Sequence, residues 1–339
     1  MAMSRPSPTP PQEGEEGLSH DCKELLSSLP TTNGGRFTHL YQYEGFWYNQ
    51  QFLLGIIACQ RHFQAHDSDL LLATTPKSGT TWLKALAFAI TNRARYPFPQ
   101  HPLLTNNPHK LVPYLEMNLY YGNSTPDPER IRSLGLFSTH MPYTSLPQSI
   151  KDSNCKVVYL CRNPGDVFIS FWHFSNNLKV PETQSPISLE DAFDLFCAGI
   201  SMYGPFWDHV LGYWKESKER PEKVMFLKYE DLKREPVAPV KRLAEFLGCP
   251  FTPQEDREGM LHDILKLCSF ENLSNLEVNK IGKTRHGNND PYEVEHKHLF
   301  RRGEVGDSLN YLTTQMIERL DQIMEEKLQG YDLTFQVSV

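Results

Sequence analysis

The segment 75–82 (TPKSGTTW) is the part of the chain best suited to chemistry, because a lysine, a glycine and several hydroxyl side chains stand together there. An apolar run at 69–74 comes before it, and an apolar stretch at 82–96 follows it. This order predicts a strand, a loop and a helix. The N–H groups at a helix N-terminus attract an anion. We therefore predict a P-loop-like phosphate-binding loop formed by Lys77, Ser78, Gly79, Thr80 and Thr81.

This loop is not the usual triphosphate-binding loop. That motif is G-x-x-x-x-G-K-[ST], in which the lysine follows the second glycine and the next hydroxyl holds magnesium. Here Lys77 precedes Gly79. An ordinary helix cap would explain Ser78 but would leave the lysine, the glycine and two threonines in front of Trp82 unexplained. The pattern favours a phosphate site of a different kind.

Three further apolar runs are predicted to be strands, and they span 135–139, 156–161 and 224–228. Ligands of open α/β sheets bind beyond the carboxyl ends of the strands. The residues that follow these runs are His140, Arg162 and Tyr229. Neutral histidine accepts a proton near pH 7, so His140 is the candidate general base.

A second phosphate site is predicted around Arg162. Its planar guanidinium suits phosphate oxygens, and Ser170 adds a hydroxyl eight residues further along the next helix. Taken singly, Arg162 could be a surface ion pair and Ser170 a hydroxyl bonded to its own helix. The segment Arg301-Arg302-Gly303 follows a hydrophilic stretch at 281–298 and is interpreted as a clamp on the distal phosphate.

Composition limits the classes of function. The chain has 339 residues, a net charge of −7 and seven cysteines without a C-x-x-C pair. The acidic balance argues against a general nucleic-acid binder, and the cysteines indicate a reducing compartment. The longest clean apolar stretch, 52–59, is too short to span a membrane, and the first residues lack the apolar core of a secretory signal. No metal-binding signature is present. We expect a cytoplasmic protein without a metal.

Strands that alternate with helices predict one α/β domain, with a central parallel sheet flanked by helices. We place this domain at 18–335. Residues 1–17 are predicted to be a disordered tail, and 281–298 a mobile lid. The predicted helices span 18–29, 52–64, 82–96, 164–176, 188–200, 205–218, 239–247 and 314–328, and 97–113 is expected to be irregular.

Together these residues resemble the cytosolic sulfotransferases that use 3′-phosphoadenosine 5′-phosphosulfate (PAPS). The resemblance covers about 40–330 and is greatest to the plant soluble group that acts on flavonols, hydroxyjasmonate, steroids or desulfoglucosinolates. It implies an α/β fold and an in-line transfer of a sulfuryl group without a metal. The segments that carry it are PKSGTTW (76–82), STHMP (138–142), YLCRNPGDVFISFWHF (159–174), FLKYEDLK (226–233), CSFENL (268–273) and FRRGEVGD (300–307).

The resemblance also implies roles for individual residues. The catalytic set would be His140, Lys77 and Ser170. The 5′ phosphosulfate would lie on the loop formed by Lys77, Ser78, Gly79, Thr80 and Thr81. The 3′ phosphate would bind Arg162, Ser170, Arg301, Arg302 and Gly303, and the adenine would bind Trp82, Tyr229, Cys268 and Phe270.

The acceptor pocket is expected to be apolar and aromatic. Phe174 lies where the family carries a pocket-gating aromatic. The other candidates are Tyr43, Phe46, Trp47, Tyr143, Tyr203 and Phe206.

The chain departs from the family pattern at several positions. Arg302 replaces a lysine, Ser308 replaces a tryptophan, Cys268 replaces a threonine, and Ser138 replaces a lysine of animal members. The animal dimer signature aligns with 309–318 and keeps only Thr313 and Glu318, which favours a monomer.

The acceptor stays open at this point. A flavonol or a hydroxyjasmonate is favoured, and a steroid, a brassinosteroid or a desulfoglucosinolate is the alternative. The partners expected are this small acceptor and PAPS, with no nucleic acid and no membrane. A nucleotide-dependent phosphotransferase would need a metal-binding hydroxyl and an acidic residue, and its lysine would stand elsewhere. A silent nucleotide-binding protein would be favoured by loss of Lys77 or His140, and both are present.

Overall fold

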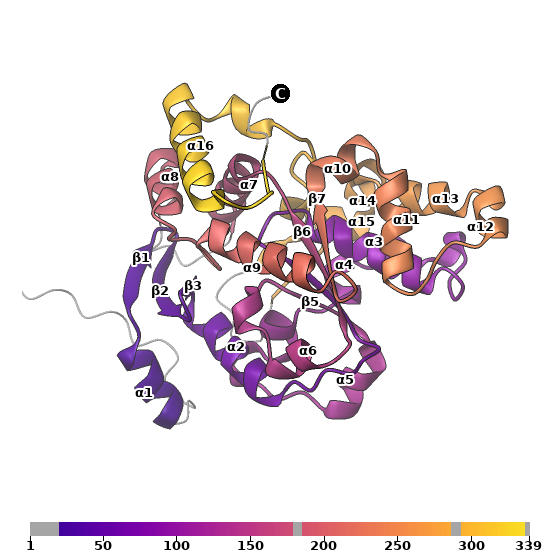
Figure 1. The fold of residues 1–339 in the computed structure, drawn as a ribbon, viewed down its shortest axis with the longest axis horizontal. Coiled ribbons are helices and arrows are strands. Elements are labelled where there is room, and N and C mark those ends of the chain that lie inside the picture. The colour runs from indigo at the N-terminus through magenta and orange to yellow at the C-terminus, as the bar shows by residue number, and fades with distance from the viewer. Residues whose placement is uncertain (1–19, 179–184, 286–292, 336–339) are drawn as a thin grey trace, which may run out of the picture.

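The computed structural model describes residues 20–178, 185–285 and 293–335. Its centre is a four-stranded parallel sheet in the order β5-β4-β6-β7 (Figure 1). The predicted strands are confirmed, each to within one residue. Their bounds are β4 Leu70–Thr74, β5 Leu136–Thr139, β6 Lys156–Cys161 and β7 Val224–Lys228.

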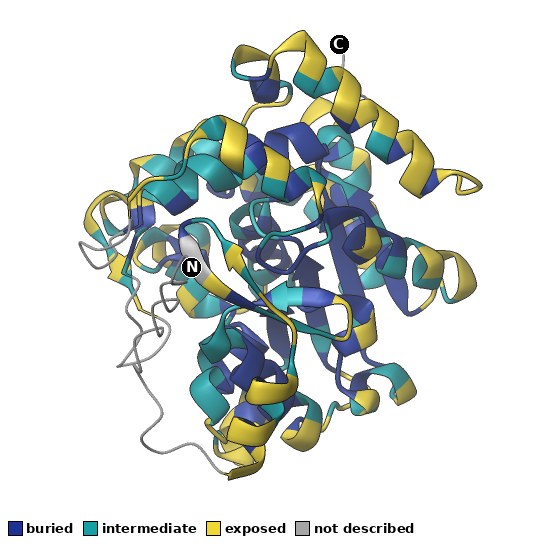
Figure 2. Cartoon of the chain, turned by 90° about the vertical axis from the view of Figure 1, so that its left-hand side faces the viewer, coloured by how far each residue is buried: buried dark blue, intermediate teal, exposed yellow. Residues whose placement is uncertain are grey.

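Alternate residues of these strands enter two separate hydrophobic cores. Val157 and Tyr159 of β6 belong to one core, whereas Val158 and Leu160 belong to the other. Both faces of the sheet are therefore covered, which explains why the strands lack polar alternation. The buried strands run through the middle of the molecule, and the exposed residues lie on the outer helices (Figure 2).

Helices fill both layers around the sheet. The core that contains Val157 also contains residues of α2, α7, α8, α9 and α16. The core that contains Val158 also contains residues of α3, α11, α13 and α14. The helices are α1 His20–Ser28, α2 Gln50–His62, α3 Thr80–Asn92, α4 Pro108–Leu111, α5 Pro128–Leu134, α6 Gln148–Asp152, α7 Pro164–Asn176, α8 Leu189–Cys197, α9 Phe206–Glu219, α10 Tyr229–Arg234, α11 Val237–Phe246, α12 Pro253–Glu258, α13 Met260–Leu267, α14 Phe270–Asn275, α15 Glu277–Ile281 and α16 Thr314–Leu328.

Shorter helical turns connect these elements. They are η1 Phe98–Gln100, η2 Pro102–Leu104, η3 Leu115–Leu119, η4 Tyr121–Asn123, η5 Tyr143–Ser145, η6 His296–Leu299 and η7 Asp307–Asn310. The stretch predicted to be irregular, 97–113, holds η1, η2 and α4. Each of the three has a proline in its first two positions, where the missing N–H would have no helical partner in any case.

Two small antiparallel sheets lie outside the main one. The first joins β1 Thr31–Gly34, β2 Phe37–Tyr43 and β3 Phe46–Tyr48, with a tight turn at Glu44 and Gly45 between β2 and β3. The second pairs β8 Lys283–Thr284 with β9 Val294–Glu295.

The second small sheet lies within 281–298, the segment predicted to be a mobile lid. The described part of this segment has regular structure, since α15 ends at Ile281 and β8, β9 and η6 follow it. Residues 286–292 and the predicted tail at 1–17 lie outside the described residues. The mobility of both segments stays a prediction.

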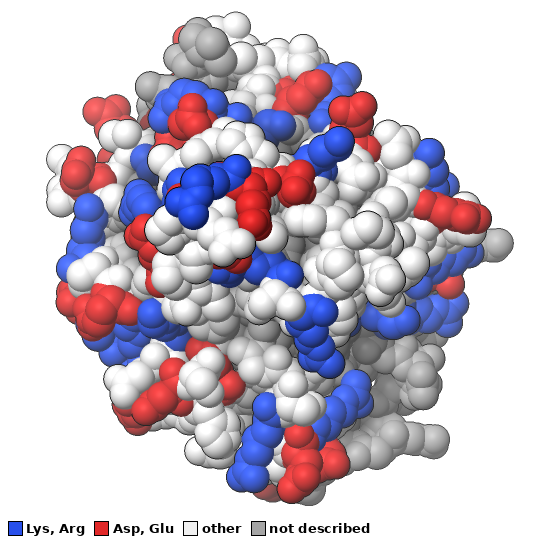
Figure 3. Space-filling view, turned by 90° about the vertical axis from the view of Figure 1, so that its right-hand side faces the viewer, with Lys and Arg blue, Asp and Glu red and all other residues white. Residues whose placement is uncertain are grey.

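The surface over α11 to α13 carries both signs of charge. In Figure 3, basic and acidic side chains are interspersed over this side of the molecule. None of the described helices is long and apolar enough to cross a membrane.

Candidate active site

The phosphate-binding loop lies where the sequence predicts it, between β4 and the first turn of α3. Gly79 has a φ of 99° and forms the N-cap of α3. A Cβ atom at this position would lie 2.7 Å from Cδ2 of Tyr229, so both the backbone conformation and the close packing require glycine. The loop thereby brings the N-terminus of α3, where anions bind, to the edge of a cavity of about 390 Å³.

Lys77 projects from this loop into the cavity. Its Nζ donates to the carbonyl of His298 at 3.3 Å and lies 4.1 Å from the centroid of the Phe174 ring. Burial lowers the pKa of Lys77 most, and together with the positive charges of Arg301 and Arg162 it brings this pKa to about 7. Three cations therefore converge on one cavity, and an anion bound between them would favour the charged form of the lysine.

The hydroxyl groups of the loop are not equivalent. Thr80 and Thr81 line the cavity, whereas Ser78 is fully buried and is not among the lining residues. The Ser78 hydroxyl bonds to that of Thr75 at 2.5 Å. The Ser78 side chain therefore bonds within the loop, and the predicted contact of Ser78 with a phosphate stays a prediction.

His140 follows β5, and hydrogen bonds hold both its backbone and its ring. Its backbone N–H donates to Glu116 Oε1 at 2.8 Å. Its Nδ1 lies 2.7 Å from the carbonyl oxygen of Thr74, and a carbonyl only accepts, so Nδ1 carries the ring proton. The ring also packs against Tyr114 and Tyr203, with centroids 4.8 and 5.4 Å away. This tautomer places the lone pair on Nε2, as a general base requires.

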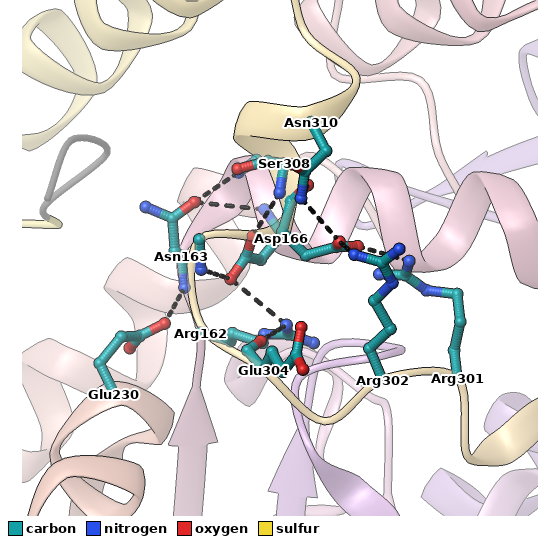
Figure 4. A network of polar contacts seen from close by, with 12 residues as sticks. Arg162, Asn163, Asp166, Glu230, Arg301, Arg302, Glu304, Ser308 and Asn310 are labelled. Atoms are coloured by element: carbon teal, nitrogen blue, oxygen red, sulfur yellow. Dashed lines mark hydrogen bonds and ion pairs between the residues drawn. The ribbon is translucent and has the colours of Figure 1, made fainter.

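A second cationic region surrounds Arg162, at the carboxyl end of β6. The guanidinium donates to the carbonyl of Glu304 at 2.6 Å and to Asp166 Oδ2 at 3.3 Å (Figure 4). It also lies 4.6 Å from the Tyr229 ring. Ser170, on α7, lines the same cavity. The structure thus brings together the pair from which the sequence predicts a second phosphate site.

Arg301 and Arg302 reach this region from the segment that follows η6. Both guanidiniums pair with the buried carboxylate of Asp307. Burial raises the pKa of Asp307, but the pairing with both arginines outweighs this effect, so its net pKa lies below the usual value. Gly303 has a φ of 66°, and a Cβ there would lie 2.5 Å from Phe270.

An aromatic cleft adjoins the second cationic region. The rings of Trp82 and Tyr229 meet edge to face, with centroids 5.6 Å apart. Cys268 and Phe270 also line the cavity, so all four residues expected around an adenine line the same cavity. Burial raises the pKa of Cys268, so its thiol stays protonated and apolar.

The acceptor side of the cavity differs from the sequence-based expectation. Phe174 and Tyr203 line it, but five of the expected aromatics do not: Tyr43, Phe46, Trp47, Tyr143 and Phe206. These five pack in or against the core beside β3, η5 and α9, because aromatic residues are more often used for packing. Among the lining residues that sequence reasoning missed are Asn49, Phe52, His109, Tyr114, Met117, Phe171, Leu178 and Met202.

Two buried charged residues that do not line the cavity were also missed. Lys84 is fully buried, as is Glu116, whose carboxylate accepts from both His140 and Thr139. A lysine inside the apolar run of α3 was the available signal for these residues. Among the described residues, no group of three or more His, Cys, Asp or Glu side chains is placed to hold a metal ion.

The parallel sheet, the anion-binding loop and the cationic aromatic cleft together define an α/β enzyme that binds a phosphorylated nucleotide beside an acceptor. Comparison with known proteins specifies the class. Residues 67–332 match the model of the sulfotransferase domain, and the chain belongs to this family.

Relatives cover nearly the whole chain. Cytosolic sulfotransferase 15 of Arabidopsis thaliana is 49% identical over 97% of this chain and 91% of its own length. The crystal structure of an Arabidopsis thaliana protein, provisionally described as a steroid sulphotransferase, is 39% identical and superimposes with a TM-score of 0.74, covering 97% of this chain and all of that one. Mouse sulfotransferase SULT7A1, solved with PAP, shares the fold at 24% identity and a TM-score of 0.63, covering 86% of this chain and 95% of that one. The chain is thus a sulfotransferase.

Proposed function

We propose that this enzyme transfers the sulfuryl group of PAPS to a hydroxyl group of a small, largely apolar acceptor. The proposal rests on the set of residues that line one cavity. Its wall holds the Lys77 loop, the cations Arg162, Arg301 and Arg302, and the base His140. One compartment therefore offers groups for two anionic ends of a nucleotide and for the proton of an acceptor.

The residues divide the chemistry among them. PAPS supplies the sulfuryl group, whose bond to the phosphate oxygen breaks as a bond to the acceptor oxygen forms. His140 takes the acceptor proton on Nε2. Lys77 and the N-terminus of α3 stabilise the charge that develops on the leaving phosphate, as fixed dipoles and charges do in water-excluded sites. Positioning in the cavity contributes the rest.

The acceptor is proposed to be a flavonol or a hydroxyjasmonate. Apolar and aromatic side chains such as Phe52, Met117 and Phe171 dominate the acceptor side, which suits a flat or alicyclic molecule that carries few polar groups. A steroid, a brassinosteroid or a desulfoglucosinolate is the alternative. The steroid sulphotransferase description of the 39% identical structure is the observation that keeps the steroid class in the test.

The test is transfer of labelled sulfate from PAPS to four panels of acceptors, with and without a metal chelator. The panels are flavonols, hydroxyjasmonates, steroids including brassinosteroids, and desulfoglucosinolates. We expect turnover on one class at a rate that the chelator leaves unchanged. If the protein binds neither PAPS nor PAP, the proposal is overturned. Binding of PAP without turnover on any panel member would contradict the four acceptor classes while retaining the nucleotide site.

We also propose a cellular compartment and an oligomeric state for this chain. The relatives are named cytosolic sulfotransferases, and we propose the same compartment for this chain. The weak match of 309–318 to the animal dimer signature supports a monomer. Sedimentation at micromolar concentration, with and without PAP, tests the oligomeric state, and a dimer in both samples would contradict the proposal.

A further inference from the structure

A fully buried lysine lies one helical turn beyond the phosphate-binding loop. Lys84 follows Thr81 by three residues on α3, so both side chains lie on the same side of the helix. Its apolar neighbours in sequence, Leu83 and Ala85, are also completely buried. A hydrophobic residue of similar size would be at least as stable in such a place, because burial of an amine costs hydration free energy. The lysine therefore calls for a reason other than stability.

The amine of Lys84 contacts two rings. Its Nζ lies 3.0 Å from Nδ1 of His109 and 3.3 Å from the centroid of the Tyr114 ring. The two rings are stacked on each other, with centroids 5.5 Å apart and planes 21° apart. Burial lowers the pKa of Lys84 well below its usual value, and the buried carboxylate of Glu116 opposes this shift. The amine lies between an aromatic ring and an imidazole nitrogen, and a cation–π contact holds it further when it is charged.

The imidazole continues to the phosphate-binding loop. Nε2 of His109 lies 2.9 Å from the hydroxyl oxygen of Thr81. The Lys84 amine has N–H donors in both its neutral and its charged form. When it donates to Nδ1 of His109, Nε2 carries the ring proton. Nε2 then donates to Thr81, and the proton of the Thr81 hydroxyl points elsewhere. Thr81 and His109 both line the cavity of about 390 Å³.

We propose that Lys84 is a positioning residue that acts through His109. It fixes the tautomer of His109 and so keeps the hydroxyl of Thr81 as a hydrogen-bond donor to the phosphosulfate end of the nucleotide. This inference rests on the proposed function, because the anion at Thr81 is the one that PAPS would supply. It adds a residue outside the cavity wall to the set that prepares the loop for its ligand.

The first test is a double-mutant cycle on kcat/KM for PAPS. Lys84→Met removes the donor and keeps the volume, and Thr81→Val removes the hydroxyl. We expect Lys84→Met to lower kcat/KM roughly fivefold to tenfold in the wild-type background, the effect of one hydrogen bond of ordinary net strength. In the Thr81→Val background, the same change should cost less than twofold. Equal losses in both backgrounds would mean a merely structural role and would overturn the proposal.

Lys110→Met is the matched control, because Lys110 is an exposed lysine beside His109 on α4. We expect it to leave kcat/KM unchanged. A loss equal to that of Lys84→Met would show that any charge change near α4 has this effect, and it would overturn the specific role of Lys84.

The second test does not depend on activity or on a folded Lys84 variant. Nitrogen-15 spectra of histidine-labelled wild-type protein, assigned by comparison with His109→Asn, report which ring nitrogen of His109 carries the proton. We expect the proton on Nε2, and a proton on Nδ1 would overturn the proposal. If the wild-type enzyme transfers no sulfate but the proton is on Nε2, the proposed function fails while the link from Lys84 to Thr81 holds.

Discussion

The backbone N–H of His140 donates a 2.8 Å hydrogen bond to the fully buried carboxylate of Glu116. Burial raises the pKa of Glu116, and the hydrogen bonds from His140 and Thr139 oppose that shift. The carboxylate therefore fixes the start of the loop that carries His140, the proposed base. This relationship could not be inferred from the sequence spacing, since 24 residues separate the two positions.

Glu116→Ala is expected to lower the free energy of unfolding by about 1–3 kcal/mol, because it leaves buried donors of His140 and Thr139 without their acceptor. Urea denaturation measures this loss. Glu116→Gln is the matched control, since its amide oxygen retains one acceptor, and it should lose less. Equal losses in the two variants would contradict the role of the acceptor.

His140→Ala is expected to lower kcat by about 10²–10⁴-fold, which is the range for general acid–base groups. The dissociation constant of PAP should stay within about twofold, because the ring contacts Tyr114 and Tyr203 rather than the loop cations. Steady-state rates and calorimetric titration with PAP measure the two quantities. A large loss of PAP affinity with retained turnover would assign His140 to nucleotide binding instead.

The affinity for PAP is expected to fall as the pH rises above about 7. The pKa of Lys77 is lowered to about 7 in the free protein, and a bound anion raises it. Above pH 7 the free amine is mostly neutral, so binding must take up a proton. Below pH 7 it is charged in both states, and this dependence disappears.

Calorimetry at pH 8 in two buffers with different ionisation enthalpies measures this proton uptake. Lys77→Met should bind more weakly and should lose the part of the uptake that belongs to the lysine. The same uptake in wild type and Lys77→Met would show that another group titrates.

Asp307→Asn is expected to lower the free energy of unfolding by about 1.5–3 kcal/mol, because hydrogen bonds to charged groups have this strength. The carboxylate pairs with both Arg301 and Arg302, and without it these charges face each other and Arg162 uncompensated. Saturating PAP should recover part of the loss, since phosphate oxygens would offer new partners. Urea denaturation with and without PAP checks this, and the same loss in both series would mean that the arginines do not meet the nucleotide.

The strands and the phosphate loop were predictable from the sequence because local signals determine them. The run at 156–161 is continuously apolar, and the loop around Gly79 combines helix-start residues with a glycine at a positive φ. The helices within 253–281 were not predicted, because they are short and their ends do not coincide with the ends of the sequence motifs. Short helices give weak periodicity, so packing decides whether they form.

The strands, the loop with Lys77 and the place of His140 after β5 could be predicted from the sequence, because each depends on residues that are adjacent in the chain. The order of the strands and the choice of aromatic residues that line the cavity depend on tertiary contacts. Phe174 and Tyr203 line the cavity, while Tyr43 and Tyr143 do not. An aromatic side chain has the same local pattern in a core as in a pocket, and the difference lies in contacts between distant segments. For the same reason, the series of contacts from Lys84 through His109 to Thr81 could not be predicted from the sequence. These contacts form only when α4 packs on α3.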